Sequence, residues 1–308
     1  MTKSEVIDVT AATTRSPIIL QAILLFALLL DLCPLAARMD ALAYMDSERR
    51  VKLDAPFVRT PDYVIAEILS KAGVGKDDIL YDLGSGDGRI VIQAALKTGC
   101  RSVGIEIESE LVDDSRQNAL RAGVTDRVRF VVADIFKEDV SEATVVTIYM
   151  SGDVNVRLRP KLLRELRPGT RIATYNFDMG DWKHDDISSF GREDAYFWVV
   201  PANFSGKWTW EAIKGRTKTQ WDLVLKQEFQ EISGHVTRDG TQYAVRNGKI
   251  KGDRIRFTLE QGPAGKATPV EFAGRIRRNT IEGTFTRGTD SRPWKALRNP
   301  STMQRIDK

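Results

Sequence analysis

The sequence predicts an α/β protein with a largely parallel sheet, followed by a small antiparallel β barrel or sandwich. Three observations lead to this fold class. From residue 61 to residue 175, short apolar runs alternate with segments whose apolar residues recur at helical spacing. After about residue 199, helical spacing is absent, and strand-like runs alternate with glycine-bearing turns. Finally, 308 residues are enough for two domains, which we place at 44–200 and 201–308.

The first part contains successive strand and helix patterns. Thr60 and Pro61 suit the N-cap and the first position of a helix over 61–71. A buried-strand pattern at 78–83 ends in a glycine-rich turn. The later elements are helices over 89–98, 111–122 and 160–166, and strands over 102–107, 128–133, 144–150 and 171–175. Repeated strand–helix units predict a parallel sheet with helices on both faces.

The second part has about six to eight predicted strands. Strand-like runs occupy 207–212, 221–231, 254–259, 270–277 and 280–286. We expect turns at Ser233-Gly234, Asp239-Gly240, Asn247-Gly248 and 251–253. Tryptophans could stack on a ligand, but the core of a small barrel is the simpler place for Trp208, Trp210 and Trp221.

Charge differs between the two parts. From residue 205 onward, about 21 Lys and Arg accompany about 11 Asp and Glu, so this part is basic and the preceding part acidic. A basic module could face acidic protein, anionic lipid or nucleic acid, or its charges could simply keep it soluble.

A glycine-rich loop follows the first predicted strand. Residues 81–89 read YDLGSGDGR, and the loop opens a helix. Gly84, Gly86 and Gly88 permit positive φ and let a ligand approach backbone N–H groups at the helix N-terminus. Because such loops also bind dinucleotides, the glycines alone do not identify the ligand.

Acidic residues make the ligand more specific. Asp82 precedes the first glycine of the loop, and Ser85 and Asp87 lie within the loop. An acidic loop suits a ligand with an amino group and a sulfonium better than a pyrophosphate, so it favours S-adenosylmethionine over NAD. Glu106 ends the next strand and can accept both ribose hydroxyls, while Asp134, after the third strand, can accept the adenine amino group. The alternative is that these acids are ordinary surface turn residues.

These motifs resemble class I S-adenosylmethionine-dependent methyltransferases, which have a Rossmann-like sheet. The segment FVRTP at 57–61 resembles the YVPTP element of the protein-lysine methyltransferase family that includes archaeal broad-specificity enzymes and the mitochondrial ATP-synthase c-subunit methyltransferase. Phe57 and Arg59 differ from that element, which bears on substrate preference. The resemblance covers roughly 54–182 and implies no role for the β-rich part.

The resemblance implies roles for individual residues. Thr60 would contact the methionine end of the cofactor. Asp82, Gly84 and Gly86 would hold its amino acid moiety, with Glu106 on the ribose and Asp134 on the adenine.

The residues expected to bind the methyl acceptor follow the fourth predicted strand. Alignment of donor and acceptor accelerates methyl transfer without a dedicated nucleophile. In YMSGDVN, residues 149–155, Tyr149 and Asn155 are the candidates for orienting the acceptor; otherwise Tyr149 is a core residue and Asn155 a helix cap. The NPPY signature of nucleobase and glutamine-amide methylases is absent. Residues 181–186 (DWKHDD) lack metal-ligand spacing, so we expect a solvated loop and no metal.

The leading hypothesis is a methyltransferase acting on protein lysine side chains, with a protein substrate as partner and no nucleic acid. A small-molecule or lipid methyltransferase is one alternative. A non-catalytic cofactor-binding scaffold, whose β-rich module binds a partner, is the other.

The N-terminal segment favours export. Residues 18–30 are almost wholly apolar, follow Lys3 and Arg15, and precede an A-x-A site at 41–43. This pattern predicts a signal peptide over 1–43 and a periplasmic enzyme. An uncleaved membrane anchor, with basic residues on its C-terminal side, would instead leave the enzyme facing the cytoplasm. A buried N-terminal helix is the third possibility. Without Cys33, only Cys100 would remain, so no intrachain disulfide could form.

Overall fold

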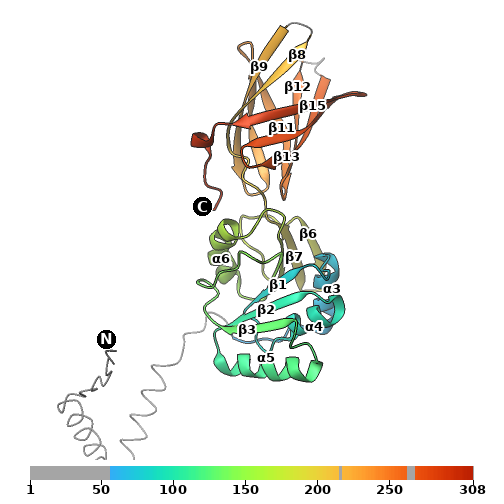
Figure 1. The fold of residues 1–308 in the computed structure, drawn as a ribbon, viewed down its shortest axis with the longest axis vertical. Helices are drawn as coiled ribbons and strands as arrows, with labels where there is room; N and C mark the ends of the chain where they lie inside the picture. Colours follow the sequence, from blue (N-terminus) through green and yellow to red (C-terminus); the bar gives the residue numbers. More distant parts are fainter. Residues whose placement is uncertain (1–55, 215–216, 262–267, 308) are drawn as a thin grey trace, which may run out of the picture. The chain divides into compact units, whose positions relative to one another are not determined.

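The computed structural model describes residues 56–214, 217–261 and 268–307 (Figure 1). The predicted signal peptide or anchor, Cys33 and the start of the first predicted domain lie outside the described residues. Within these residues, no helix has the length and apolar character needed to cross a membrane.

The α/β part is built on a seven-stranded sheet with the order β3-β2-β1-β4-β5-β7-β6. The first five strands pair in parallel, and β7 is antiparallel to both of its neighbours, β5 and β6. This order places β1 beside β2 and β4, so their carboxyl ends share one edge. The strands are β1 (Ile79–Leu83), β2 (Arg101–Glu106), β3 (Val128–Val132), β4 (Val145–Ile148), β5 (Arg171–Tyr175), β6 (Asp186–Ser189) and β7 (Asp194–Val199).

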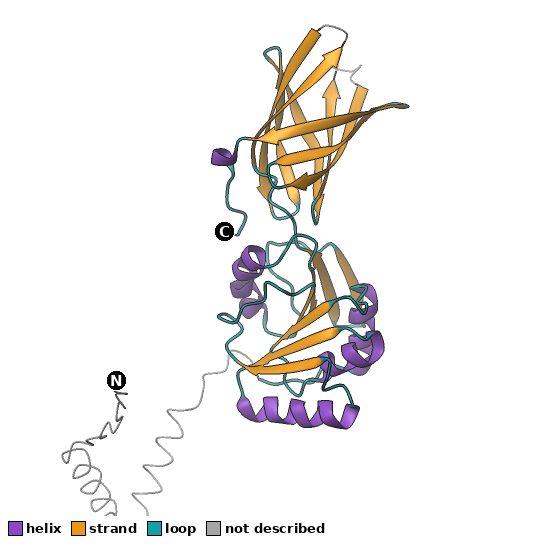
Figure 2. Cartoon of the chain, viewed as in Figure 1, coloured by secondary structure: helices purple, strands orange, loops and turns teal. Residues whose placement is uncertain are grey.

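Helices cover both faces of this sheet, as predicted (Figure 2). On one face, Leu80 packs with apolar residues of α3 and α4, and Phe130 packs with α4 and α5. On the other face, Leu83 packs with α6. Alternate residues of β1 therefore serve two different cores. The helices are α3 (Asp62–Lys71), α4 (Arg89–Thr98), α5 (Ser109–Ala122) and α6 (Gly152–Glu165).

Three helix starts differ from the prediction. α5 begins at Ser109, two residues before the predicted start. α6 begins at Gly152, eight residues before the predicted start, and Pro160 lies inside it. The prediction was wrong because proline is common at the first helical position, yet a helix interior can also accept one at the cost of a hydrogen bond. The N-cap of α3 is Pro61 and has no side-chain cap, so Thr60 is not the N-cap.

The strands β6 and β7 at the end of the sheet were not predicted from the sequence. β6 is a short, mostly exposed strand and has no apolar run to reveal it. The segment 181–186 is exposed, as expected for a solvated loop, except for Trp182. Trp182 is 1% exposed, and its carbonyl accepts a hydrogen bond from Trp198 Nε1. Its indole packs on Phe229, with ring centroids 5.8 Å apart.

The C-terminal part is a closed eight-stranded antiparallel barrel rather than a sandwich. Its interior holds the predicted tryptophans Trp208, Trp210 and Trp221, together with Phe257 and Phe272. The strands, in the order of the barrel, are β10 (Glu231–Arg238), β11 (Thr241–Lys251), β12 (Arg254–Gln261), β13 (Thr268–Arg277), β14 (Thr280–Arg287), β15 (Asp290–Arg298), β8 (Gly206–Lys214) and β9 (Thr217–Glu228).

Two of the predicted turns are bulges within strands. The pairing of β10 with β11 shifts between Ile232 and His235, and that of β11 with β12 shifts between Arg246 and Lys249. A Cβ at Gly234 would lie 1.9 Å from the Val224 carbonyl oxygen, so this glycine permits close approach of two strands. Asp239-Gly240 is a turn, as predicted, with both residues at positive φ.

A buried arginine lies where the barrel closes. β15 and β8 pair through Leu297 with Thr209 and Arg298 with Trp208. Arg298 is 9% exposed, and its guanidinium lies 4.8 Å from the Trp208 ring centroid. It donates to the carbonyls of residues 203, 205 and 278 and to the Asn279 side chain. Burial lowers the pKa of Arg298.

Candidate functional site

The carboxyl ends of β1, β2 and β4 bring the predicted acidic residues to one edge of the sheet. Asp82 lies opposite Gly104 of β2 and Thr147 of β4. Glu106 is the last residue of β2. Such an edge is where open α/β sheets bind their ligands.

The loop between β1 and α4 needs its glycines. Gly84, Gly86 and Gly88 have φ values of 81°, 53° and 78°. The backbone N–H groups of Gly84 and Ser85 donate to the Ile105 carbonyl at 2.9 and 3.0 Å, which ties the loop to β2. Residues with a Cβ would be strained at these positions.

Glu106 is held by the backbone. Its Oε2 accepts the Gly86 N–H at 2.9 Å, and its Oε1 accepts the N–H groups of Ile107 and Glu108 at 2.7 and 3.1 Å. Glu106 as a whole is 7% exposed. Each carboxylate oxygen has two lone pairs, so Oε2 retains one for a ligand hydroxyl.

Asp82 is almost fully buried at 2% exposure. Burial raises its pKa to about 7, and the nearby Glu106 and Asp87 carboxylates act in the same direction. The Thr147 hydroxyl opposes this shift by donating to Asp82 Oδ1 at 2.7 Å. A cation placed next to Asp82 would favour its ionised form.

The two remaining predicted acids differ from Asp82. Burial would raise the pKa of Asp87, but Arg89 holds it below its usual value through hydrogen bonds of 2.6 and 2.9 Å. Asp87 also lies 3.7 Å from Arg59, so much of its charge is already compensated. The pKa of Asp134 is lowered, first by the Phe136 N–H and then by Lys137. Asp134 is thus an ionised acceptor just beyond β3.

Two side chains lie directly over the loop. A Cβ at Gly84 would meet the Met150 methyl at 2.5 Å, and one at Gly86 would meet the Phe57 ring at 2.2 Å. Thr60 is 3% exposed, and its carbonyl accepts a hydrogen bond from Arg89 Nη1 at 3.3 Å. Phe57 and Thr60, both upstream of α3, are thereby brought close to a loop about 25 residues later.

These residues fit S-adenosylmethionine. The edge offers carboxylates for an ammonium group and for hydroxyls. Within the described residues, the Ser85 hydroxyl is buried without a hydrogen-bond partner. This hydroxyl points into the protein beneath the loop, since a Cβ at Gly104 of β2 would meet it at 2.6 Å.

The residues predicted to orient the acceptor follow β4, and β5 is the next strand along the same edge. Ile148 pairs with Thr174, so Tyr149 and Tyr175 leave neighbouring strands together. Their ring centroids are 4.8 Å apart. The Tyr175 hydroxyl donates to Glu193, just before β7, and the Tyr149 side chain hydrogen-bonds Asn176. Burial, and then Glu193, raise the pKa of Tyr175.

Asn155 is a buried residue that holds a neighbouring segment in place. It lies in the first turns of α6 with 0% exposure, and it is not a helix cap because Ser151 is the N-cap. Its Nδ2 donates to the Phe177 and Asp178 carbonyls at 3.0 and 3.2 Å. Asn155 therefore fixes the segment after β5, while Tyr149 is the half-buried residue of the predicted pair.

Sequence reasoning missed three polar residues of this edge: Thr147, Tyr175 and Glu193. Thr147 carried a signal, because it is a lone polar residue in the buried strand β4. Finding its partner required the strand register. No sequence signal marked Glu193, because it lies in a polar stretch between two strands that were not predicted.

Comparison with known proteins points to methyltransferases. The family model of the ANTKMT methyltransferase domain matches residues 82–186. A protein-lysine N-methyltransferase of Saccharolobus islandicus is 43% identical over 133 residues, which cover 43% of this chain and 83% of that protein. The ATP synthase c-subunit lysine N-methyltransferase of Xenopus laevis is 36% identical over 49% of this chain and 66% of its own length.

A solved structure is also similar. The crystal structure of an RNA methyltransferase from Salinibacter ruber with S-adenosyl-L-homocysteine has 48% sequence identity and a TM-score of 0.47, and covers 48% of this chain and 96% of that one. Because the archaeal relative is matched across most of its length, this chain belongs to the same family, the protein-lysine N-methyltransferases, as an S-adenosylmethionine-dependent enzyme.

Proposed function

We propose that this protein methylates lysine side chains of a protein substrate. The observation that carries the proposal is the arrangement of Tyr149, Tyr175 and Glu193 beside the cofactor loop. Aromatic rings next to a carboxylate attract an alkylammonium group. The archaeal relative, named a protein-lysine N-methyltransferase, supports the same class of acceptor.

For the cofactor, we propose the residues predicted from the loop and the strand ends. Asp82 would attract the ammonium of the amino acid moiety, with Thr60, Gly84, Ser85 and Gly86 around it. Glu106 would accept from the ribose and Asp134 from the adenine. Asp87 would act through Arg89, to which it is already bound. Bound S-adenosylmethionine supplies an electrophilic methyl group on its sulfonium.

For the acceptor, the residues of this chain would bind and orient the amine. Tyr175 donates to one oxygen of Glu193, which leaves the other oxygen for a lysine ammonium. Tyr149, fixed by Asn176 and by the Tyr175 ring, would orient the amine, and Asn155 would hold the segment after β5 in place. Desolvation favours the neutral, nucleophilic form of the amine, whereas the Glu193 carboxylate favours the ammonium that binds first.

The test uses the purified full chain, methyl-labelled S-adenosylmethionine and extracts of the host. We expect label in a protein band that protease removes and ribonuclease does not, with methyllysine after hydrolysis. Glu193→Gln should lower kcat/KM about 10–100-fold because a charged hydrogen-bond partner of the acceptor is lost. Its affinity for S-adenosylhomocysteine should be unchanged.

Glu142→Gln is the matched control, since Glu142 is exposed and lies at the opposite end of β4. Label that ribonuclease removes, or that extracts into organic solvent, would contradict a protein acceptor. Equal losses in the two variants would contradict the role of Glu193. No label at all, with normal cofactor binding, would favour the non-catalytic alternative.

We further propose two domains, at 44–200 and 201–308, and an exported or membrane-anchored location. The location rests only on the sequence of residues 1–43, with its apolar run and A-x-A site. Mass spectrometry of the N-terminus of the cellular protein tests it. A chain starting near residue 44 supports cleavage, and an intact chain that resists alkaline extraction from membranes supports the anchor. An intact chain that alkali releases would contradict both.

A further inference from the structure

The hairpin of β11 and β12 carries four cations on its outer face. Lys249, Lys251, Arg254 and Arg256 are exposed, while Ile250 and Ile255 between them point into the barrel core. The strand register places Lys249 opposite Arg256 and Lys251 opposite Arg254. On its other side, Arg254 lies opposite a further cation, Arg275 of β13.

This arrangement does not serve folding. Like charges directly opposite each other on neighbouring strands destabilise a sheet. Lys249 is compensated by Glu231 at 2.7 Å, and Arg275 by Asp253. No hydrogen bond or ion pair of the Arg254 or Arg256 side chain is found within the described residues. Local rules of this kind are broken mainly where a function requires it.

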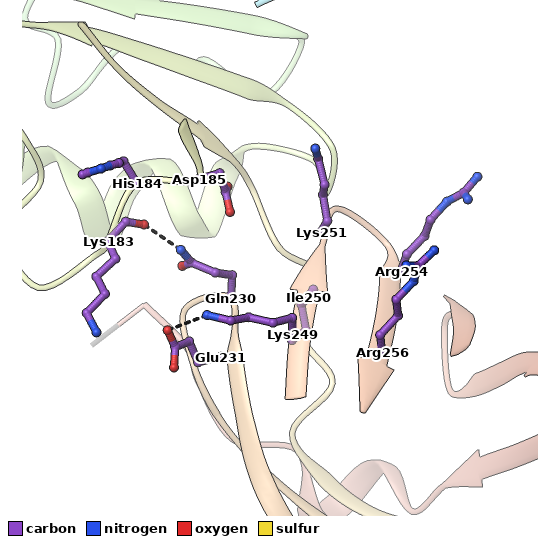
Figure 3. Close-up of a pocket in the computed structure, with 10 residues that line it drawn as sticks. All are labelled: Lys183, His184, Asp185, Gln230, Glu231, Lys249, Ile250, Lys251, Arg254 and Arg256. Atoms are coloured by element: carbon purple, nitrogen blue, oxygen red, sulfur yellow. Dashed lines mark hydrogen bonds and ion pairs between the residues drawn. The ribbon is translucent and has the colours of Figure 1, made fainter. Parts of the chain in front are cut away.

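The four cations line a cavity of about 670 Å³ (Figure 3). Lys183, His184 and Asp185 line it from the segment before β6, with Gln230 and Glu231 from the start of β10. Gln230 donates to the Lys183 carbonyl at 2.6 Å, which joins these two segments. Five Lys and Arg side chains and two carboxylates line the cavity, one of them the Glu231 paired to Lys249, so the cavity has a net positive charge.

The cavity is remote from the methyl-transfer edge. Asp185 donates its N–H to the Phe197 carbonyl and accepts the Val199 N–H, near the end of β7. Because β7 runs antiparallel to β5, that end adjoins the start of β5, and the carboxyl ends of β4 and β5 lie at the opposite edge. A ligand in this cavity would therefore not be the methyl acceptor at that edge.

The lining chemistry fits a phosphate group. Arginine presents a planar set of donors that matches phosphate, and lysine adds a point charge. Nucleic-acid surfaces of comparable charge usually add aromatic side chains on which bases stack. No Phe, Tyr or Trp lines this cavity. The lining therefore favours isolated phosphate groups over a nucleic acid.

We propose that this cavity binds a phosphate-bearing ligand, with Arg254 and Arg256 as its principal contacts. The phosphate can belong to a soluble molecule or to a phospholipid headgroup, since the contacts would be the same. A headgroup would make the barrel a membrane-recruitment module, and a soluble phosphate would make it a sensor.

The test measures thermal unfolding of the full chain with sodium pyrophosphate at constant ionic strength, and its co-sedimentation with vesicles. The vesicles are phosphatidylcholine alone or phosphatidylcholine with phosphatidic acid. Wild type should be stabilised by pyrophosphate, and the double variant Arg254→Glu/Arg256→Glu should bind it at least about 10-fold more weakly. Sedimentation only with phosphatidic acid identifies a headgroup. Binding of pyrophosphate without sedimentation identifies a soluble ligand.

The double variant also separates function from folding. Glutamates opposite Lys251 and Lys249 replace like-charge pairs with opposite-charge pairs, so its melting temperature without ligand should equal or exceed that of wild type. The control is Lys226→Glu/Arg246→Glu, two exposed cations of the barrel outside the cavity. Equal weakening in the control, no response of wild type to either probe, or binding of an RNA oligonucleotide without binding of pyrophosphate would overturn the proposal.

Discussion

The two parts of this protein bury charge in opposite ways. In the α/β part, the Glu106 carboxylate is held by backbone N–H groups of residues 86, 107 and 108. In the barrel, the Arg298 guanidinium is held by backbone carbonyls of residues 203, 205 and 278. Neither charge has an oppositely charged side chain as a hydrogen-bond partner within the described residues.

The two buried charged groups differ in how much of their hydrogen-bonding capacity remains unused. Glu106 and Asp82 stand at an open sheet edge and keep lone pairs that a ligand can use. Arg298 uses its donors on four groups in the seam where the barrel closes. A buried charge that is left partly unsatisfied points to binding, and one that is satisfied by nearby backbone points to architecture.

Removing the carboxylate at the open edge should have the largest effect on binding. Glu106→Ala leaves three backbone N–H groups without their acceptor and removes the predicted ribose contact. We expect affinity for S-adenosylhomocysteine, measured by isothermal titration calorimetry, to fall at least about 100-fold. Glu110→Gln, an exposed carboxylate at the start of α5, should bind normally. Wild-type affinity in Glu106→Ala would refute the assignment of this edge.

Removing the buried guanidinium should act on stability and leave binding unchanged. In Arg298→Met, the carbonyls of the seam lose their donors, which should lower the free energy of unfolding by about 3 kcal/mol. Urea denaturation measures this loss. Arg292→Met, which removes an exposed cation near the start of the same strand, is the control. If Arg298→Met also weakened cofactor binding, the two parts would not divide binding and architecture between them.

The pH dependence of stability sharpens the contrast, because the buried Asp82 carboxyl of the α/β part has a pKa near neutral pH. The pKa of Asp82 is about 7 in the folded chain, against 3.8 for an unperturbed carboxyl. The folded chain thus keeps a proton that the unfolded chain has lost, and its stability falls as the pH rises between these values. From pH 5 to pH 7, the free energy of unfolding of wild type should fall by about 2 kcal/mol relative to that of Asp82→Asn. Urea denaturation at several pH values measures the gap. A gap that does not change with pH would contradict the raised pKa.

The smallest effect concerns the barrel glycines. Gly240→Ala should cost about 1 kcal/mol, because φ is positive there but open space surrounds the position. Gly234→Ala should cost more, because its Cβ would meet a backbone carbonyl. Thermal unfolding of the two variants ranks them. Equal losses would mean that β9 and β10 separate easily at the bulge.

The gathering of acidic residues at one edge of the sheet was predictable from sequence. Asp82, Glu106 and Asp134 each follow or end an apolar strand pattern, and parallel strands bring such positions together. What could not be predicted is which neighbour each acid meets. Thr147 reaches Asp82 only through the β1–β4 register, and Asp87 is bound to Arg89, two residues away.

The sequence was less informative where one residue type serves two purposes. Glycine permits both turns and close strand approach, so the pattern did not separate the turn at Asp239-Gly240 from the bulges near Gly234 and Gly248. Proline suits both a helix start and, less often, a helix interior, which hid the first two turns of α6.

The seam between β15 and β8 has a consequence for the order of folding. These strands are the last and first of the barrel, so their pairing joins residues about 90 positions apart in the chain. Contacts between such distant segments form late, after the local hairpins from β9 to β15. A ribosome also releases the α/β part before β15 exists. We therefore expect the proposed cofactor edge to fold while the barrel is still an open sheet. Burial of Arg298 between β15 and β8 would then be the last step of folding.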